Sequence, residues 1–348
     1  MLRTVIFLGA GASNSDGAPL QSELFRCFFE ANRNETIQNR YSNSIEYTKK
    51  NQRLRDFLRY FFGINSFETA SNKEFPTFEE ALGVLDLAIR SGEEYRNVAG
   101  LLNEYRESLI FALALAIEYG LDYKCSRLDY RNNHQKLGNY VKTIYDTTDR
   151  GKVNFISTNY DLLIDNALAN LTLPDKRFGP SLAKVHGSLN LLYCPVCKKI
   201  DTYRGKKIAI TAMTLREPVY CSKCGSLQKA VIVPPTYFKE YSNHYLQQQW
   251  RLAERLLTEA KHIVFCGYSF PDADIHVKYL LKKAEINRSQ RNTFKISVIN
   301  HFDEKEENIS KNEEERFRRF FRMTDDEHFN YLEMSFEDFV NNPNVILI

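Results

Sequence analysis

The sequence predicts an α/β fold in which a parallel sheet has helices on both faces and is joined by a cysteine-rich module and a helical insert. The first observation is a set of apolar, partly β-branched runs that end in glycine or polar residues, as buried parallel strands do. The second is a pair of Cys-x-x-Cys motifs. The third is a long stretch, residues 31–135, that is rich in charged and aromatic residues and contains helix-like segments.

The first predicted strand, residues 4–8, ends at Gly9 and Gly11. Glycine permits backbone conformations and close approaches that a Cβ would obstruct. Main-chain N–H groups after this strand can therefore point at a phosphate near a helix N-terminus, and we expect that helix to begin near Pro19. The spacing is not Gly-x-Gly-x-x-Gly, because Asn14 stands where that motif has its third glycine. Taken alone, the turn fits a packing role as well as a phosphate site.

Four further predicted strands end in the same manner. The segments that follow them are Thr158-Asn159-Tyr160-Asp161, His186-Gly187, Gly267-Tyr268-Ser269 and Asn300. The carboxyl ends of parallel strands meet at one edge of an open α/β sheet, and ligands bind at that edge. The five segments together therefore predict one ligand site, which core packing alone does not explain.

Four cysteines form the motifs Cys194-Pro195-Val196-Cys197 and Cys221-Ser222-Lys223-Cys224. Four thiolates in this arrangement suit tetrahedral zinc, and four protein ligands leave no open coordination position. We therefore predict a structural zinc site. The gap between the pairs is slightly longer than usual in a zinc ribbon, and a loose hairpin from Lys198 to Tyr220 is expected to fill it. Two redox dithiols, or pairs that arose by chance, are the alternatives.

These features set the predicted domain boundaries. Residues 1–30, 136–190 and 229–348 form the core that contains the sheet, residues 31–135 the helical insert, and residues 191–228 the zinc-ribbon module.

Three further segments have a predicted role in the fold. An apolar stripe on residues 53–62 is interpreted as buried core of the insert rather than as a partner surface. Residues 245–260 predict an amphipathic helix that packs on the sheet, and the charge-dense residues 303–322 predict a solvated helix or loop. Residues 329–334, followed by Ser335 as an N-cap, predict a last strand and a short helix.

Composition narrows the class of protein. At 348 residues, the chain is long enough to bury a sizeable core. Its formal net charge is only +3, and it has no basic tract interleaved with aromatic residues, so direct nucleic-acid binding is not predicted. Its longest apolar run, residues 109–117, is too short to span a bilayer. The first strand starts too close to Met1 to leave room for a signal peptide. We expect a cytoplasmic protein without membrane contact, in keeping with metal-type cysteine spacing.

The order of these segments resembles that of the sirtuin family, and more closely its bacterial SIR2-like branch associated with phage defence. Gly9-Ala10-Gly11-Ala12-Ser13 with Gly17-Ala18-Pro19 resembles the family's phosphate loop, Gly-Ala-Gly-x-Ser and Gly-Ile-Pro. Residues 157–161 resemble the family's Thr-Gln-Asn-Ile-Asp segment, and Val185-His186-Gly187 resembles its His-Gly segment. Gly267-Tyr268-Ser269 resembles its Gly-Thr-Ser segment, and Asn300 matches the Asn of its Ile-Asn segment on the adenosine side. The resemblance covers most of the chain outside residues 31–135. It implies a Rossmann-like core that binds NAD+, followed after His186 by a zinc ribbon.

The resemblance also implies roles for individual residues. Asn159 would position the ribose or the attacking water, His186 would accept a proton, and Asp161 would hold the nicotinamide carboxamide or help orient the ribose. Outside this pattern, Asn159 fits a turn residue and His186 a satisfied histidine at the rim. Asp272 and Asp274 either serve the site or cap the helix that follows them. The implied cofactor-binding residues are Gly9, Ala10, Gly11, Ser13, Pro19, Thr158, Gly267, Ser269 and Asn300.

The departures from the family lie on its acyl-peptide side. Leu20-Gln21-Ser22 stands where deacylating sirtuins have Asp-Phe-Arg, and residues 231–240 do not resemble their Val-x-Trp/Phe-Phe-Gly-Glu segment. The chain is therefore predicted to be an NAD+ glycohydrolase that uses water as the acceptor and yields nicotinamide and ADP-ribose. The resemblance further implies a homo-oligomer in phage defence, gated by a separately encoded partner such as a HerA-like ATPase.

Three alternatives remain. The first is an NAD-dependent protein deacylase or ADP-ribosyltransferase. The second is a non-catalytic module that senses NAD or ADP-ribose. The third is a nuclease role within a larger assembly, for which the sequence has no carboxylate cluster with convincing metal spacing.

Overall fold

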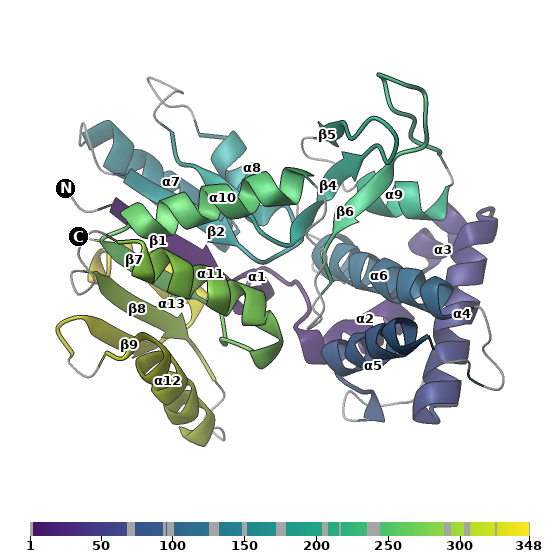
Figure 1. Ribbon diagram of the computed structural model, residues 1–348, viewed down its shortest axis with the longest axis horizontal. Coiled ribbons are helices and arrows are strands. Elements are labelled where there is room, and N and C mark those ends of the chain that lie inside the picture. Colours follow the sequence, from purple (N-terminus) through teal and green to yellow (C-terminus); the bar gives the residue numbers. More distant parts are fainter. Residues whose placement is uncertain are drawn as a thin grey trace.

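A six-stranded sheet, parallel throughout, forms one lobe of the molecule, and helices form most of the other (Figure 1). The computed structural model describes residues 3–67, 74–92, 95, 101–124, 132–147, 152–171, 179–203, 208–215, 217–234, 244–288, 294–302, 307–323 and 326–347. All the predicted strands of the sheet are present. They are β1 (Arg3–Leu8), β2 (Lys152–Ser157), β3 (Leu182–Lys184), β7 (His262–Cys266), β8 (Lys295–Asn300) and β9 (Phe329–Glu333).

The order of the strands across the sheet is β3-β2-β1-β7-β8-β9. Numbered by their place in the chain, these six strands run 3-2-1-4-5-6, so the direction of winding reverses between β1 and β7. This is the Rossmann-type doubly wound order, in which a dinucleotide binds across the crevice at the reversal point. The predicted α/β fold class is therefore confirmed.

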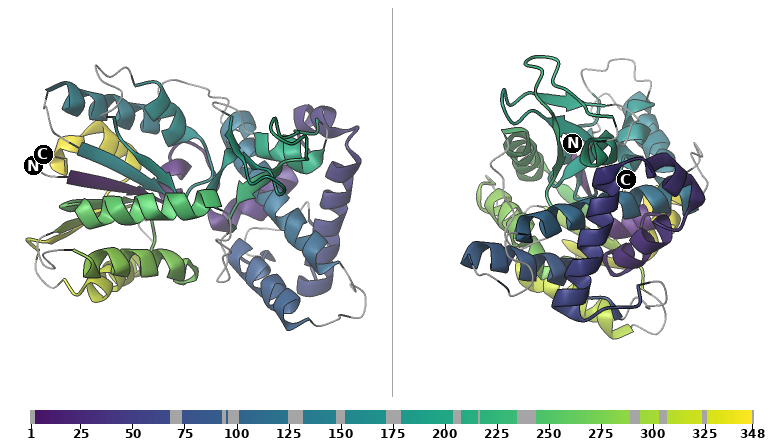
Figure 2. Two further views of the ribbon diagram at one scale, coloured as in Figure 1. Left: turned by 45° about the horizontal axis from the view of Figure 1, so that its top comes forward. Right: turned by 90° about the vertical axis from the view of Figure 1, so that its right-hand side faces the viewer.

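Helices cover both faces of the sheet (Figure 2). Side chains alternate along each strand, so Val5 and Phe7 of β1 point to one face while Ile6 and Leu8 point to the other. The first face packs against α10 (His244–Glu259), α11 (Ile275–Ile286) and α12 (Glu307–Phe321). The second packs against α7 (Asn133–Thr147), α8 (Leu163–Ala169) and α13 (Phe336–Asn341). The predicted packing of residues 245–260 on the sheet is thus confirmed, as is the N-cap Ser335, which accepts a hydrogen bond from the Asp338 N–H.

Two elements of this lobe differ from the prediction. The helix expected near Pro19 is present as a 3-10 turn, Gln21–Glu23, that leads into α2 (Leu24–Ala31), but an unpredicted short helix, α1 (Ala10–Asn14), precedes it directly after Gly9. Helix α12 was expected to be solvated, but Phe317 and Phe321 on one of its faces are buried against the sheet. Its many charged residues conceal a stripe of apolar residues, which is enough to dock a helix on a sheet.

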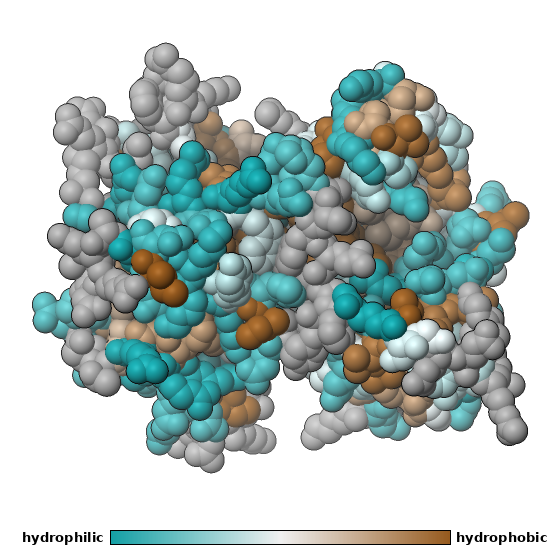
Figure 3. Space-filling view, in the orientation of Figure 1, coloured by the Kyte–Doolittle hydropathy of each residue, from teal (hydrophilic) through white to brown (hydrophobic). Residues whose placement is uncertain are grey.

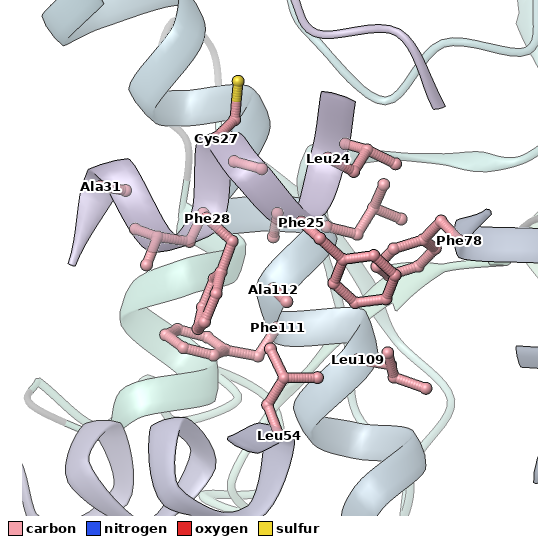
Figure 4. Close-up of a cluster of buried hydrophobic side chains, with 14 of the residues drawn as sticks. Leu24, Phe25, Cys27, Phe28, Ala31, Leu54, Phe78, Leu109, Phe111 and Ala112 are labelled. Carbon is pink, nitrogen blue, oxygen red and sulfur yellow. The ribbon is translucent and has the colours of Figure 1, made fainter. Parts of the chain in front are cut away.

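The other lobe is helical. It consists of α2 (Leu24–Ala31), α3 (Glu35–Tyr41), α4 (Ile45–Phe62), α5 (Phe78–Ser91) and α6 (Leu102–Glu118). Aromatic side chains fill its centre, where Phe25, Phe28, Phe78 and Phe111 gather from α2, α5 and α6 (Figure 4). Leu54, Phe57 and Leu58 of α4 are fully buried, which confirms that this stripe is core. The buried residues of α2 belong to this cluster, although α2 precedes residue 31 in the chain.

A three-stranded antiparallel sheet stands beside the helical lobe. It is formed by β4 (Gly187–Tyr193), β5 (Ile200–Thr202) and β6 (Lys229–Ile232) in the order β5-β4-β6. The segment between the cysteine pairs is not a plain hairpin, because it contains the helix α9 (Ile208–Thr214). Ala209 and Ile210 of α9 pack into the core of the helical lobe, and the Ser44 hydroxyl donates to the Thr214 carbonyl at 2.6 Å.

The surface is mixed in character. On the face in Figure 3, hydrophilic side chains dominate and hydrophobic ones form separate patches. No helix within the described residues is long and apolar enough to cross a membrane.

Candidate active site at the carboxyl edge of the sheet

The five predicted segments all lie at the carboxyl edge of the sheet, which faces the helical lobe (Figure 1). Gly9 follows β1, Thr158 follows β2, and Gly267 follows β7. His186 lies between β3 and β4, and Asn300 is the last residue of β8. Parallel pairing brings these strand ends together, although they are up to about 290 residues apart in the chain.

The two glycine turns pack directly on each other at the reversal point between β1 and β7. The Gly9 N–H donates to the Cys266 carbonyl at 2.9 Å, and the Gly11 N–H donates to the Gly267 carbonyl at 2.8 Å. A Cβ on Gly267 would lie 2.0 Å from the Ala12 nitrogen, and its φ of +61° also favours glycine. These two N–H groups therefore hold the two turns together, and a phosphate contact by other main-chain N–H groups of this turn stays a prediction.

A chain of buried hydrogen bonds joins the loops after β1 and β2. The Asn159 amide Nδ2 donates to the Gly9 carbonyl and to the Ser13 hydroxyl, both at 2.8 Å. The Ser13 hydroxyl in turn donates to Asp161 Oδ2 at 2.7 Å, and Asp161 Oδ1 accepts from the Leu163 N–H at 2.9 Å. Both Nδ2 hydrogen bonds are thus made inside the protein, and within the described residues no hydrogen bond reaches the Asn159 amide oxygen.

A buried lysine clamps the same loop to β3. Lys184 Nζ donates to the Asp161 carbonyl at 2.6 Å and to Asp165 Oδ2 at 3.0 Å. Burial by itself would raise the pKa of Asp161, but Lys184, His134 and the hydrogen bonds from Ser13 and Leu163 hold that pKa below its usual value. Asp161 is therefore an ionised carboxylate that fixes Ser13, and through it Asn159.

His186 is buried at the junction of the two lobes. Its ring stacks on Tyr160 with a centroid distance of 6.2 Å, and its Nε2 lies 3.7 Å from Asp274 Oδ1. The neighbouring Val185 carbonyl accepts a 2.9 Å hydrogen bond from the indole Nε1 of Trp250 on α10. Asp274 was considered as a helix cap, but its side chain makes no capping bond to α11 and faces His186 instead.

The Asn300 side chain bonds to Glu313, a residue that the sequence analysis did not identify. Its Nδ2 donates to the Tyr268 carbonyl at 3.2 Å and to Oε1 of Glu313, a fully buried residue of α12. Burial raises the pKa of Glu313 above its usual value, against the hydrogen bonds from Asn300 and Tyr331. This buried acid of α12, which accepts hydrogen bonds from Asn300 and Tyr331, was hidden in the charge-dense stretch of sequence around it.

The remaining predicted cofactor residues have different degrees of exposure. The Thr158 hydroxyl is buried and donates to the Leu8 carbonyl at 3.3 Å. Pro19 is buried, whereas Ala10 and Ser269 are exposed beside the two turns. A second buried pair, Asp16 and His134 with Nδ1 2.6 Å from Oδ2, ties the loop after α1 to the start of α7 and was not found from the sequence.

The four predicted zinc ligands converge. The sulfur atoms of Cys194, Cys197, Cys221 and Cys224 all lie within 4.8 Å of one another. Sulfur ligands about 2.3 Å from a tetrahedral zinc ion would be separated by about 3.8 Å, so the cluster is consistent with structural zinc. The residue after each Cys-x-x-Cys pair, Lys198 or Gly225, has a left-handed backbone that closes the two turns in the same way.

Comparison with known proteins gives limited similarity. No protein-family model and no curated protein matches the sequence. Among solved structures, "Sir2-p53 peptide-NAD+" matches with 15% identity and a TM-score of 0.43, over 97% of this chain and 90% of that one. "Sir2 bound to acetylated peptide" matches with 14% identity and a TM-score of 0.42 over the same shares. Similarity at this level assigns neither a family nor an activity.

Proposed function

We propose that this chain is an NAD+ glycohydrolase. The observation that carries the proposal is the position of Asn159, Asp161 and His186. They are buried together at the edge where a 3-2-1-4-5-6 sheet binds dinucleotides. Buried polar residues at such an edge are costly for the fold unless they have partners. Here Ser13 bonds to Asn159 and Asp161, Lys184 donates to the Asp161 carbonyl, and Asp274 lies 3.7 Å from His186. The resemblance of the sequence segments to those of sirtuins supplies the identity of the dinucleotide.

The reaction is hydrolysis of the bond between nicotinamide and ribose. The electron pair of the C–N bond leaves with nicotinamide, which becomes a neutral base, and positive charge develops on the ribose carbon. The oxygen of water forms the new bond to that carbon, and its proton passes to His186 and then to solvent. The Asn159 amide oxygen orients the ribose or the water, and Asp161 acts through Ser13 to hold that amide in place.

The resemblance extends the proposal to the biology. We place the chain in the cytoplasm of bacteria as a gated effector of phage defence. It would act as a homo-oligomer with a separately encoded partner such as a HerA-like ATPase. Support for this part comes from the sequence motifs alone. We also propose that the four-cysteine cluster holds zinc, because its donors and spacing suit that ion.

Chromatography of the products tests the activity. Purified protein is incubated with NAD+, and nicotinamide and ADP-ribose are quantified beside the variants Asn159→Ala and His186→Ala. We expect both products in equal amounts without any peptide, and a loss of about 100-fold or more in each variant. Product formation only with an acyl-peptide would favour the deacylase alternative. Binding of NAD+ without turnover, with or without a partner, would favour the sensor.

A further inference from the structure

We propose that Asp274 is a positioning residue that orients His186 and stabilises its protonated form, an inference that rests on the proposed hydrolase. Asp274 is buried at the end of the short 3-10 helix η5 (Asp272–Asp274). One of its oxygens lies 3.7 Å from His186 Nε2, and the other accepts a hydrogen bond from the Tyr268 hydroxyl at 3.1 Å. A buried carboxylate needs such partners, because removing it from water is expensive.

The loop that carries Asp274 is held in a strained conformation. Phe270, four residues earlier, has a φ of +55°, which a residue with a Cβ adopts only when its surroundings require it. Its ring is buried against Phe317 and Phe320 of α12, with centroid distances of 4.6 and 4.9 Å. Aromatic packing on the sheet thus fixes the loop at the point where it delivers Asp274 to His186.

The neighbouring acid, Asp272, has a different environment. Its side chain is largely exposed and pairs with Lys278 at 2.6 Å. The two carboxylates are two residues apart on one turn, but only Asp274 faces the histidine. Within the described residues, the titratable groups placed against His186 include Asp274 and Tyr160, and Tyr268 lies behind Asp274.

A carboxylate at this distance affects a general base in two ways. It orients the imidazole ring, and it stabilises the imidazolium that forms when the histidine takes a proton from water. The proton remains on the histidine until solvent removes it, and it does not pass to Asp274. Sequence spacing does not reveal this pair, because His186 and Asp274 come from different strand ends.

Two measurements on Asp274→Asn, with Asp272→Asn as the matched control, test the proposal. The first is the pH dependence of kcat for NAD+ hydrolysis. The second is an NMR titration of the histidine side chains, in which His186→Ala identifies one of the seven histidines. We expect Asp274→Asn to lower kcat about 100-fold with little change in KM. We also expect it to lower the titration midpoint of His186 by about one pH unit or more, because the imidazolium loses its carboxylate.

The control separates a local effect from a general one. Asp272→Asn should leave both readouts at the wild-type value, and Tyr268→Phe should shift the titration in the same direction by less. An unchanged His186 titration in Asp274→Asn overturns the proposal even if activity falls, since a merely structural role would not move that titration. A shifted titration with unchanged kcat also overturns it. If wild-type protein releases no nicotinamide with or without a partner, the proposed hydrolase fails, while the titration still decides the contact.

Discussion

The two lobes bury charged groups in different ways. In the helical lobe, buried Lys50, Asp86 and Glu118 each pair with a side chain that reaches solvent, at 65%, 27% and 43% exposure. At the edge of the sheet, by contrast, Ser13, Asn159 and Asp161 bond to one another and to main-chain atoms, and Lys184 joins this network through the Asp161 carbonyl. Lys184 also pairs with Asp165, whose side chain is 21% exposed. The first pattern belongs to amphipathic helices around an apolar core. The second is a polar network centred inside the protein, and it lies at the edge where we propose that the reaction takes place.

Metal removal should have the largest effect on stability, and it should destabilise the helical lobe more than the sheet lobe. Because α9 lies between the cysteine pairs and packs into the helical core, loss of the cluster releases Ala209 and Ile210 from that core. We expect Cys221→Ser, or treatment with a chelator, to lower the melting temperature by about 10 °C or more. Hydrogen exchange should rise in α4, α6 and α9 before it rises in the sheet.

The exposed residue between the ligands gives the control for metal removal. Lys223→Ala should keep about one zinc ion per chain in elemental analysis and the wild-type melting temperature. Full zinc content in Cys221→Ser would contradict the assignment of the ligands, as would equal loss of protection in both lobes.

The contact between the glycine turns should be the next most sensitive feature. In Gly267→Ala the new Cβ would meet the backbone of Ala12 and Gly11, neither of which can move as a flexible side chain does. We expect a loss of about 4 kcal/mol in the free energy of unfolding from chemical denaturation. Gly63→Ala in the helical lobe has a similar φ, +68°, but open space around it, and should lose only about 1 kcal/mol. Equal losses in the free energy of unfolding of the two variants would show that the close approach of the turns does not contribute to the cost of Gly267→Ala.

Lys184→Met tests the polar network through its dependence on pH. The lowered pKa of Asp161 contributes stability that is present above the pKa of an unfolded carboxyl group and is lost as pH falls through the folded value. Without Lys184 the folded pKa rises, so acid unfolding should begin at a higher pH. At neutral pH we expect a loss of about 3 kcal/mol, measured by denaturation.

A surface pair provides the comparison for Lys184. Lys283 pairs with Glu254 on exposed parts of α10 and α11, and Lys283→Met should change stability by no more than about 0.5 kcal/mol. If the midpoint of acid unfolding is the same in Lys184→Met as in the wild type, Lys184 is not the residue that keeps Asp161 ionised.

The sheet was predictable because each of its central strands is buried on both faces and therefore forms an uninterrupted apolar run. Asn159, His186 and Gly267 could be placed at its edge because they directly follow such runs. The cysteine cluster was predictable because its spacing is local within each pair. The short helix α1 was missed, since Gly9 provides no capping side chain to announce it.

Residues that act through distant partners could not be predicted. Glu313 differs from its charged neighbours only in facing Asn300 and Tyr331. The Asp16 and His134 pair joins segments more than 100 residues apart, and nothing in either segment indicates the other. Helix α2 likewise follows the first glycine turn closely in the sequence, yet its Phe25 and Phe28 belong to the aromatic core of the helical lobe. Such pairings are set by tertiary packing and leave no local pattern.

Trp250 is the single tryptophan of the chain, and its indole N–H is bonded to the carbonyl of the residue before His186. The tryptophan fluorescence of the protein therefore originates beside the histidine that we propose to be catalytic. Any ligand that displaces the end of β3 changes the environment of this one indole. The protein thus carries its own optical probe, so occupancy of the site can be followed in the unmodified chain without a coupled assay.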